Sequence, residues 1–96
     1  MEKINHEMYD HLLKAILSLE NEEECASFFE DLCTIKEMQE MSRRYEVARM
    51  LHAGKNYVEI AAATGASTAT ICRVNRCLQY GSDGYTRILD RNAEKE

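Results

Sequence analysis

The chain has 96 residues, of which 45% are hydrophobic and 30% charged, with a formal net charge of −5. This balance is typical of one globular domain over residues 1–96 and excludes a disordered chain, which would hold fewer apolar residues. The absence of proline and the presence of only four glycines argue against the many turns of an all-β fold, so we expect an all-α fold. A chain this short buries little surface, so a core shared with a second copy is expected.

Neither a membrane segment nor a metal site is expected. No run of eighteen apolar residues is present, and the N-terminal sequence MEKINHEMYDHLLK is too polar for a secretory signal, which predicts a cytoplasmic protein. The cysteine and histidine spacings match no zinc motif. We therefore interpret the cysteines as buried, reduced thiols that act as small hydrophobic residues; they are Cys25, Cys33, Cys72 and Cys77.

Hydrophobic periodicity predicts six helices and no strand. The first helix covers residues 4–19, where Met8, Leu12, Ala15 and Ile16, with Leu13 and Leu17 beside them, form a broad apolar stripe. The second helix covers residues 22–33, and Asn21 is its predicted N-cap, followed by three glutamates that the helix dipole favours.

The third predicted helix covers residues 35–54 and has signals at both ends. Thr34 and Glu37 stand three residues apart, as a capping box requires, and Gly54 is the expected C-terminal stop. His52, near the end of this helix, is expected to interact with the backbone carbonyl groups there.

Residues 57–78, with the sequence YVEIAAATGASTATICRVNRCL, match a helix-turn-helix. Ala61 leaves room where the two helices cross, and Gly65, four residues later, allows a left-handed turn without a Cβ penalty. Ser67 is the predicted N-cap of the second helix. The contacts between the two helices are expected to come from Ile60, Val58 or Ala62, Ile71 and Val74.

The second helix of this motif has an outward face suited to double-stranded DNA. Small and hydroxyl side chains at its start can approach base edges and thymine methyl groups in the major groove, and the arginines can reach phosphate or guanine. An ordinary helical hairpin with a solvated polar face is the alternative. The predicted DNA-binding residues are Ser67, Thr68, Ala69, Cys72, Arg73 and Arg76.

After a turn at Gly81, residues 82–92 predict a short sixth helix with Ser82 or Asp83 as its N-cap. The last residues, NAEKE, are expected to fray.

Charge is distributed unevenly along the chain. Residues 1–40 hold 3 basic and 11 acidic side chains, residues 41–80 hold 6 and 2, and residues 81–96 hold 3 and 4. A basic segment in an acidic chain is compatible with nucleic-acid binding, because screening limits the phosphate field to about one Debye length. A solvated basic face is the other interpretation.

With these motifs in place, the segment SRRYEVARMLHAGKNYVEIAAATGASTATICRVNRCLQYGSDGY resembles the Trp repressor-like family, in its YerC/YecD branch. The resemblance implies an intertwined homodimer in which helices one, two, three and six of both chains share a core. Helices four and five would project as DNA-binding heads that enter successive major grooves about 34 Å apart. We expect a sequence-specific transcriptional regulator, and by analogy a repressor that excludes polymerase.

The family resemblance also implies a candidate effector pocket. The two arginines that hold tryptophan in the Trp repressor match Arg44 and Arg73, and a threonine matches Thr70. Val74 replaces the family's glycine beside the indole ring, and Cys77 replaces a serine, so tryptophan fits poorly and no cofactor is assigned. For Arg44 we favour a salt bridge to an acidic residue over contact with a ligand.

Two other classes of function can be compared with the sequence. The first is an interaction module: an acidic helical dimer whose second and third helices bind another protein, through a face with Phe28 and Phe29 flanked by carboxylates. Paired aromatic residues at this spacing are more often part of a dimer core. We do not expect an enzyme, because no nucleophile, base and orienting group can be assembled and no glycine-rich phosphate loop is present. His6 and His11 lie on the first helix with no such partners.

Overall fold

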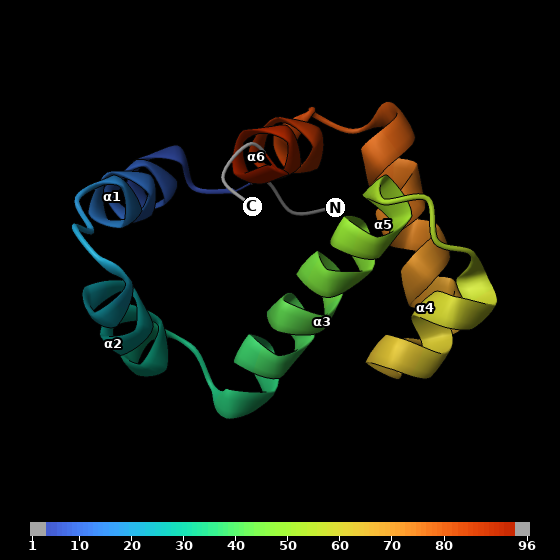
Figure 1. The fold of residues 1–96 in the computed structure, drawn as a ribbon. Coiled ribbons are helices and arrows are strands. Elements are labelled where there is room, and N and C mark those ends of the chain that lie inside the picture. The colour runs from blue at the N-terminus through green and yellow to red at the C-terminus, as the bar shows by residue number, and fades with distance from the viewer. Residues whose placement is uncertain (1–3, 94–96) are drawn as a thin grey trace. The chain divides into compact units, whose positions relative to one another are not determined.

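A computed structural model describes residues 4–93 and consists, in that range, of six α-helices and no strand (Figure 1), which confirms the predicted all-α fold. The contacts of the chain divide it into two units, Met1–Met38 and Gln39–Glu96, which we describe separately, and the single domain stays a prediction. The helices are α1 (His6–Leu17), α2 (Glu22–Leu32), α3 (Ile35–His52), α4 (Tyr57–Thr64), α5 (Thr68–Tyr80) and α6 (Gly84–Ala93).

In the unit Met1–Met38, each helix begins at a capping side chain. The Asn5 side chain accepts a hydrogen bond from the Met8 N–H at 3.0 Å, so α1 starts two residues later than predicted. The Asn21 side chain accepts from the Glu24 N–H at 2.8 Å, which confirms the predicted cap of α2. Local sequence signals therefore account for where these helices begin.

The start of α3 carries the predicted capping box. The Thr34 hydroxyl accepts from the Glu37 N–H at 3.1 Å, and the Glu37 carboxylate accepts from the Thr34 N–H at 2.8 Å. The backbone N–H of Thr34, and then its hydroxyl, hold the pKa of Glu37 below its ordinary value of 4.5. Because a carboxylate accepts these bonds best when ionised, the box is strongest above that pH.

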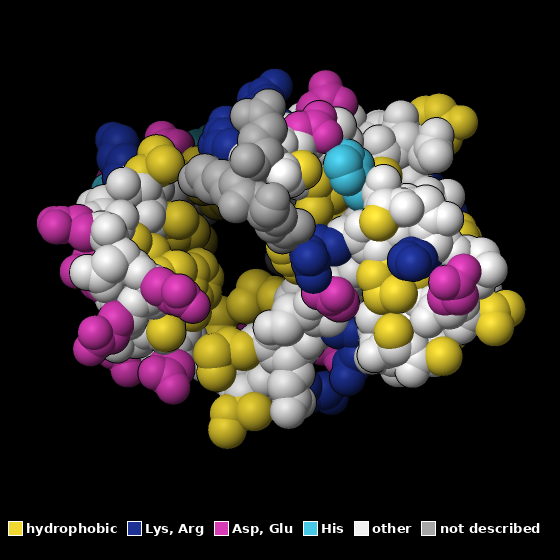
Figure 2. Space-filling model, viewed as in Figure 1, with side chains coloured by type: hydrophobic (Ala, Val, Ile, Leu, Met, Phe, Trp, Pro, Cys, Tyr) yellow, Lys and Arg dark blue, Asp and Glu magenta, His cyan; other side chains and the backbone are white. Residues whose placement is uncertain are grey.

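Neither α1 nor α2 contains a buried residue. Of the apolar stripe predicted for the first helix, Leu12, Ala15 and Ile16 are half-buried, whereas Leu17 is 84% exposed. Figure 2 shows apolar and acidic side chains gathered over α1 and α2 at the left of the view. The helices of this unit thus leave apolar surface uncovered within the described chain.

The unit Gln39–Glu96 contains the whole buried core of the described residues. The C-terminal half of α3 contributes Val47 and Ala48, both with no exposed surface, and the helix-turn-helix and α6 pack against them. The buried residues are Val47, Ala48, Ile60, Ala66, Ile71, Val74 and Leu89. The last turns of α3 are therefore the base on which the candidate DNA-binding motif sits.

Gly54 ends α3 as predicted, because the chain closes the helix with a Schellman motif in which the glycine lies just beyond the last helical turn. The Gly54 N–H donates to the Leu51 carbonyl at 3.0 Å, and the Lys55 N–H donates to the Met50 carbonyl at 3.0 Å. Gly54 has the positive φ of 85° that this motif requires. The last helical residue is His52.

The predicted role of His52 is wrong, because its ring bonds to α6 rather than to backbone carbonyls. His52 Nε2 and Asp90 Oδ1 lie 2.9 Å apart and link the end of α3 to α6. Sequence reasoning could not find this pair, since the two residues are 38 positions apart.

The connection from α5 to α6 differs from the prediction at its capping residue. Asp83 precedes α6 with a left-handed φ of 65°, and the structure gives neither Ser82 nor Asp83 a side-chain capping bond. An N-cap residue needs an extended backbone, which explains why Asp83 does not act as the predicted cap. Before it, a Cβ on Gly81 would collide with the backbone carbonyl of Cys77.

Asn92 and Ala93 belong to α6, and the remaining residues of the predicted frayed end, 94–96, lie outside the described residues. None of the helices in the range 4–93 is both long enough and apolar enough to cross a membrane.

Candidate nucleic-acid interface

The turn between α4 and α5 has the predicted left-handed residue. Gly65 has φ of 73°, and its N–H donates to the Ala61 carbonyl at 2.9 Å. The two helices are therefore separate elements joined by a tight turn rather than one continuous rod (Figure 1).

Thr64 completes this turn, a role that the sequence analysis did not identify. Its hydroxyl donates to the Ile60 carbonyl at 2.8 Å and lies 3.1 Å from the Ala66 N–H, which donates to it. A threonine commonly bonds back to the carbonyl four residues earlier, so the signal in the sequence is too general to be noticed.

The interior of the motif comes from the expected apolar positions, with one correction. Ile60, Ile71 and Val74 are buried as predicted, but Val58 is 80% exposed and Ala62 is exposed. Val58 and Ala62 each lie two residues from Ile60, which places them about 200° around the helix from it. The contacts of α4 with α5 therefore come from Ile60 and not from Val58 or Ala62.

Side-chain caps define where each helix of the motif begins. The Ser67 hydroxyl accepts from the Thr70 N–H at 3.1 Å, which confirms the predicted cap of α5. At the start of α4, Asn56 and Glu59 form a capping box, with 2.9 Å from the Glu59 N–H to the Asn56 side chain. This second box was missed, although the spacing Asn-x-x-Glu was available in the sequence.

The outward face of α5 has the composition that DNA binding requires. Every predicted DNA-binding residue is exposed, and α5 contains no acidic side chain. Within residues 4–93, neither Arg73 nor Arg76 makes an ion pair, so both guanidinium groups are available to phosphate or base edges. Their contact with DNA remains a prediction for Ser67, Thr68, Ala69, Cys72, Arg73 and Arg76.

The residues predicted to bind an effector differ in their exposure to solvent. Arg44 and Thr70 are half-buried, and Arg73 and Cys77 are exposed. Val74 is only 2% exposed, because its side chain belongs to the core of the helix-turn-helix. Their common role in binding an effector remains a prediction.

The salt bridge favoured for Arg44 is absent from the described residues. Its neighbour Arg43 is the paired residue instead. The Arg43 Nη1 donates to the Glu40 Oε1 at 2.7 Å, and its Nε donates to the Thr64 carbonyl at 3.2 Å. Sequence reasoning missed Arg43 because a bond to a distant backbone carbonyl leaves no side-chain pattern.

The prediction of buried cysteines is wrong for α5. All four thiols are free, but Cys72 and Cys77 are exposed, while Cys25 and Cys33 are half-buried. Within the described part of the chain, no three His, Cys, Asp or Glu residues gather in a way that could hold a metal ion.

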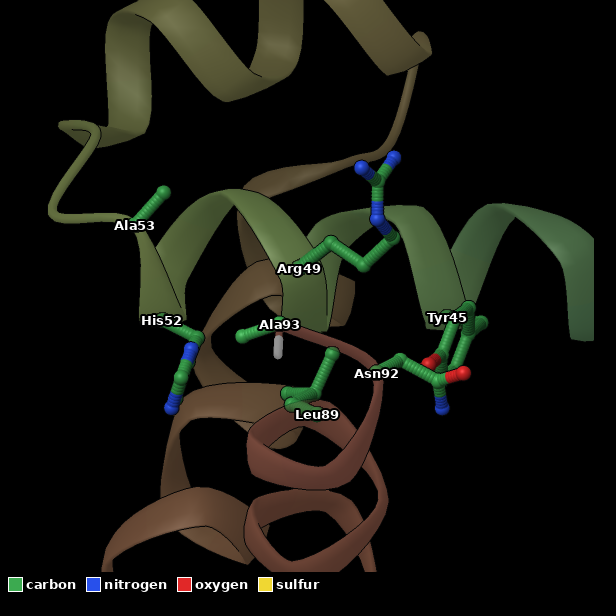
Figure 3. A pocket seen from close by; sticks show the side chains of 7 residues that line it. All are labelled: Tyr45, Arg49, His52, Ala53, Leu89, Asn92 and Ala93. Carbon is green, nitrogen blue, oxygen red and sulfur yellow. The ribbon is translucent and has the colours of Figure 1, made fainter. Parts of the chain in front are cut away.

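Among the described residues of the unit Gln39–Glu96, side chains line cavities at two places that bear on the candidate site. Cys77 lines one of about 420 Å³ at the junction of α5 and α6, together with Tyr85 and the intervening turn. The other, of about 390 Å³, lies between α3 and α6 (Figure 3). Its lining residues are Tyr45, Arg49, His52, Ala53, Leu89, Asn92 and Ala93.

Comparisons with known proteins agree with this architecture. Residues 7–93 match the family described as Trp repressor protein. The chain is 53% identical to the uncharacterized protein YerC of Bacillus subtilis (strain 168) over 96 residues, which is all of this chain and 92% of that protein.

Two solved structures are also similar. A candidate Trp repressor from Staphylococcus aureus shares 55% identity with a TM-score of 0.87, covering 90% of this chain and 86% of the other. A TrpR-like protein from Eubacterium eligens ATCC 27750 shares 52% identity with a TM-score of 0.88, covering 91% and 90%. These matches confirm the resemblance inferred from the sequence. The chain belongs to the Trp repressor family of DNA-binding helix-turn-helix proteins, in the branch that includes YerC.

Proposed function

We propose that this protein is a sequence-specific transcriptional regulator that binds double-stranded DNA as a homodimer and represses the genes it occupies. The observation that carries the proposal is the outward face of α5, which is exposed, free of acidic side chains and preceded by a tight turn. A DNA-binding role requires access to the chromosome, so the cytoplasmic location expected from the sequence is part of the proposal.

The start of α5 would contact the bases. The Ser67 hydroxyl is already engaged, since it accepts from the Thr70 N–H and bonds to the Thr70 hydroxyl at 3.1 Å. Thr68 and Ala69 are therefore the residues best placed to distinguish bases, through a hydroxyl group and a methyl contact with thymine. Arg76, two turns further along α5, would hold the phosphate backbone.

The homodimer is supported by the unburied apolar surface of the unit Met1–Met38. Tyr9, Leu13 and Leu17 follow one another at four-residue intervals on α1, and all three are exposed. A second copy that covered this stripe would remove it from water. In the proposed dimer, two α5 helices would enter successive major grooves about 34 Å apart. The target would then be a near-palindrome.

The proposal does not include tryptophan as an effector. In this chain Val74 occupies the position of the family's glycine, and its side chain is packed into the core. An indole ring would have to displace a branched side chain from a filled interior, which is unfavourable. Calorimetry with tryptophan tests this point: no heat of binding is expected, and tight binding would contradict it.

The experiment that tests the function is a selection of DNA by the purified protein. A random-sequence duplex library is incubated with the protein, and the bound fragments are sequenced. Enrichment of a near-palindrome with half-sites one turn apart would support the proposal, and no enrichment would overturn it.

Salt dependence separates DNA binding from the alternative of a protein-interaction module. Affinity for the selected duplex should fall steeply with salt if several phosphates are neutralised. Binding to a protein partner through an apolar contact with α2 and α3, the surface expected for an interaction module, should respond little to salt. Salt-insensitive association with protein and no DNA selection would favour the interaction module.

A further inference from the structure

Arg43 connects the base of the helix-turn-helix to its turn. Its guanidinium group makes two hydrogen bonds with different atoms: Nη1 donates to Glu40 Oε1 at 2.7 Å, and Nε donates to the Thr64 carbonyl at 3.2 Å. Glu40 and Arg43 lie one turn apart on α3, whereas Thr64 is the last residue of α4. The side chain therefore spans from one helix to the end of another.

The Thr64 carbonyl is a favourable acceptor for a cation. It is among the last carbonyl groups of α4, which have no partner within the helix and carry the negative end of the helix dipole. The guanidinium fork can hold Glu40 and this carbonyl at once, whereas a lysine ammonium on a flexible stem has no such fixed geometry. Glu40 thus orients Arg43 toward α4.

Thr64 is also the residue on which the turn depends. Its hydroxyl donates to the Ile60 carbonyl and accepts from the Ala66 N–H, while its carbonyl accepts from Arg43. A displacement of Thr64 would therefore move both the end of α4 and the start of α5.

We propose that Arg43 is a positioning residue for DNA recognition, which holds the α4–α5 turn at a fixed angle on α3 without touching DNA. The inference rests on the proposed function. Two α5 helices can enter successive major grooves only when each is held at the correct angle, so a loosened turn weakens binding. Arg43 acts through its bond to the Thr64 carbonyl and not through a contact with phosphate.

The chain supplies a matched control for the Glu40–Arg43 pair. Glu46 and Arg49 form an ion pair at 2.9 Å with the same spacing on the same helix, and its side chains are exposed to a similar degree. The substitutions Glu40→Gln and Glu46→Gln therefore remove the same charge from the same helix. They differ in that Glu40 orients the residue that reaches α4.

The first test measures affinity for the duplex found by selection. Arg43→Lys and Arg43→Gln should each weaken binding about 3- to 10-fold, the range for a partly exposed charged hydrogen bond, with an unchanged salt slope. Glu40→Gln should bind more weakly than Glu46→Gln. The melting temperature of each variant, followed by circular dichroism, should remain close to that of the unmodified protein.

Direct phosphate contact by Arg43 would give the opposite results. Arg43→Lys would then keep its affinity, Glu40→Gln would bind at least as tightly as Glu46→Gln, and Arg43→Gln would lower the salt slope by about one phosphate. Any of these three results would overturn the proposal.

A second test needs no DNA. Amide hydrogen exchange at Gly65 and Ala66 should accelerate in Arg43→Gln and not in Glu46→Gln, because both N–H groups bond within the turn. Equal exchange in the two variants would overturn the proposal.

If the unmodified protein selects no DNA, the proposed function fails and this inference fails with it. If the protein selects DNA and the Arg43 variants bind equally well, only this inference fails.

Discussion

The two units of the chain differ in how much of their structure they complete by themselves. All the buried side chains of the described residues lie in Gln39–Glu96, and none lies in Met1–Met38. Residues 1–38 hold 3 basic and 10 acidic side chains, whereas residues 39–96 hold 9 and 7. One unit thus has a core and nearly balanced charge, and the other has well-capped helices, an acidic surface and exposed apolar residues.

The difference between the two units shows that local sequence signals and burial have different effects. Local signals determine where a helix begins, and burial removes its apolar side chains from water. Capping residues determine where α1 and α2 begin, but caps contribute only about 1 kcal/mol each and do not remove apolar surface from water. The unit Gln39–Glu96 has both caps and a core. The comparison can be sharpened by substitutions that should affect one unit and not the other.

The largest effect is expected in the core of the unit Gln39–Glu96. Ile60 has no exposed surface, so Ile60→Ala should lower the free energy of unfolding by about 2–5 kcal/mol, from lost burial and the cavity left behind. Val58→Ala, two residues away on the exposed face of α4, is the control and should change it by less than about 0.5 kcal/mol. Urea denaturation measures the free energy of unfolding of both variants. An equal decrease in the two variants would contradict the assignment of Ile60 to the core.

The second prediction concerns the exposed stripe of the unit Met1–Met38. If the proposed homodimer covers this stripe, Leu17→Asp should convert it to monomer, because a carboxylate would be buried at the contact without a partner. Val58→Asp places the same charge at a site of similar exposure, 80% against 84%, and should leave the dimer intact. Sedimentation equilibrium gives the mass of each. A dimer that survives Leu17→Asp would show that the stripe is not covered by a second copy.

The third prediction separates base contacts from phosphate contacts on α5. Replacing Thr68 and Ala69 should change the preferred sequence, with about 1–3 kcal/mol per altered base contact. Arg76→Ala should instead weaken binding to all duplexes alike and lower the salt slope by about one phosphate. Repeating the selection with each variant provides the measurement. An unchanged preference after the first replacement would reject the role of these two residues.

The smallest effect is the pH dependence of the capping box at the start of α3. The pKa of Glu37 is lowered in the folded chain, so the box stabilises the fold fully above the ordinary value of 4.5 and loses this contribution as the pH falls through the lowered pKa. An NMR titration of the Glu37 carboxyl group should give a midpoint below 4.5. Thr34→Ala should move the midpoint only part of the way back, since the backbone N–H remains.

The sequence predicted most of the fold because its signals are local. Asn21, Thr34 and Ser67 each act within three residues of their partners, and Ala61 and Gly65 belong to one motif of fixed spacing. The outward face of α5 could be predicted for the same reason, since the motif determines which positions are buried.

The errors concern contacts between distant elements and the choice of helix face. His52 pairs with Asp90 and Arg43 reaches Thr64, and neither bond leaves a pattern in the sequence. Cys72 and Cys77 were assigned to the interior by residue type, although they lie outside the buried positions of α5. Burial depends on the face of a helix more than on the residue it carries.

Gly81 limits the length of α5. Any side chain at this position would strike the carbonyl of Cys77, so an evolving chain cannot replace this glycine without moving the backbone. The far end of the helix proposed to face DNA is therefore fixed to a glycine as long as the present backbone is kept, and substitutions along its turns are the changes that leave this end in place.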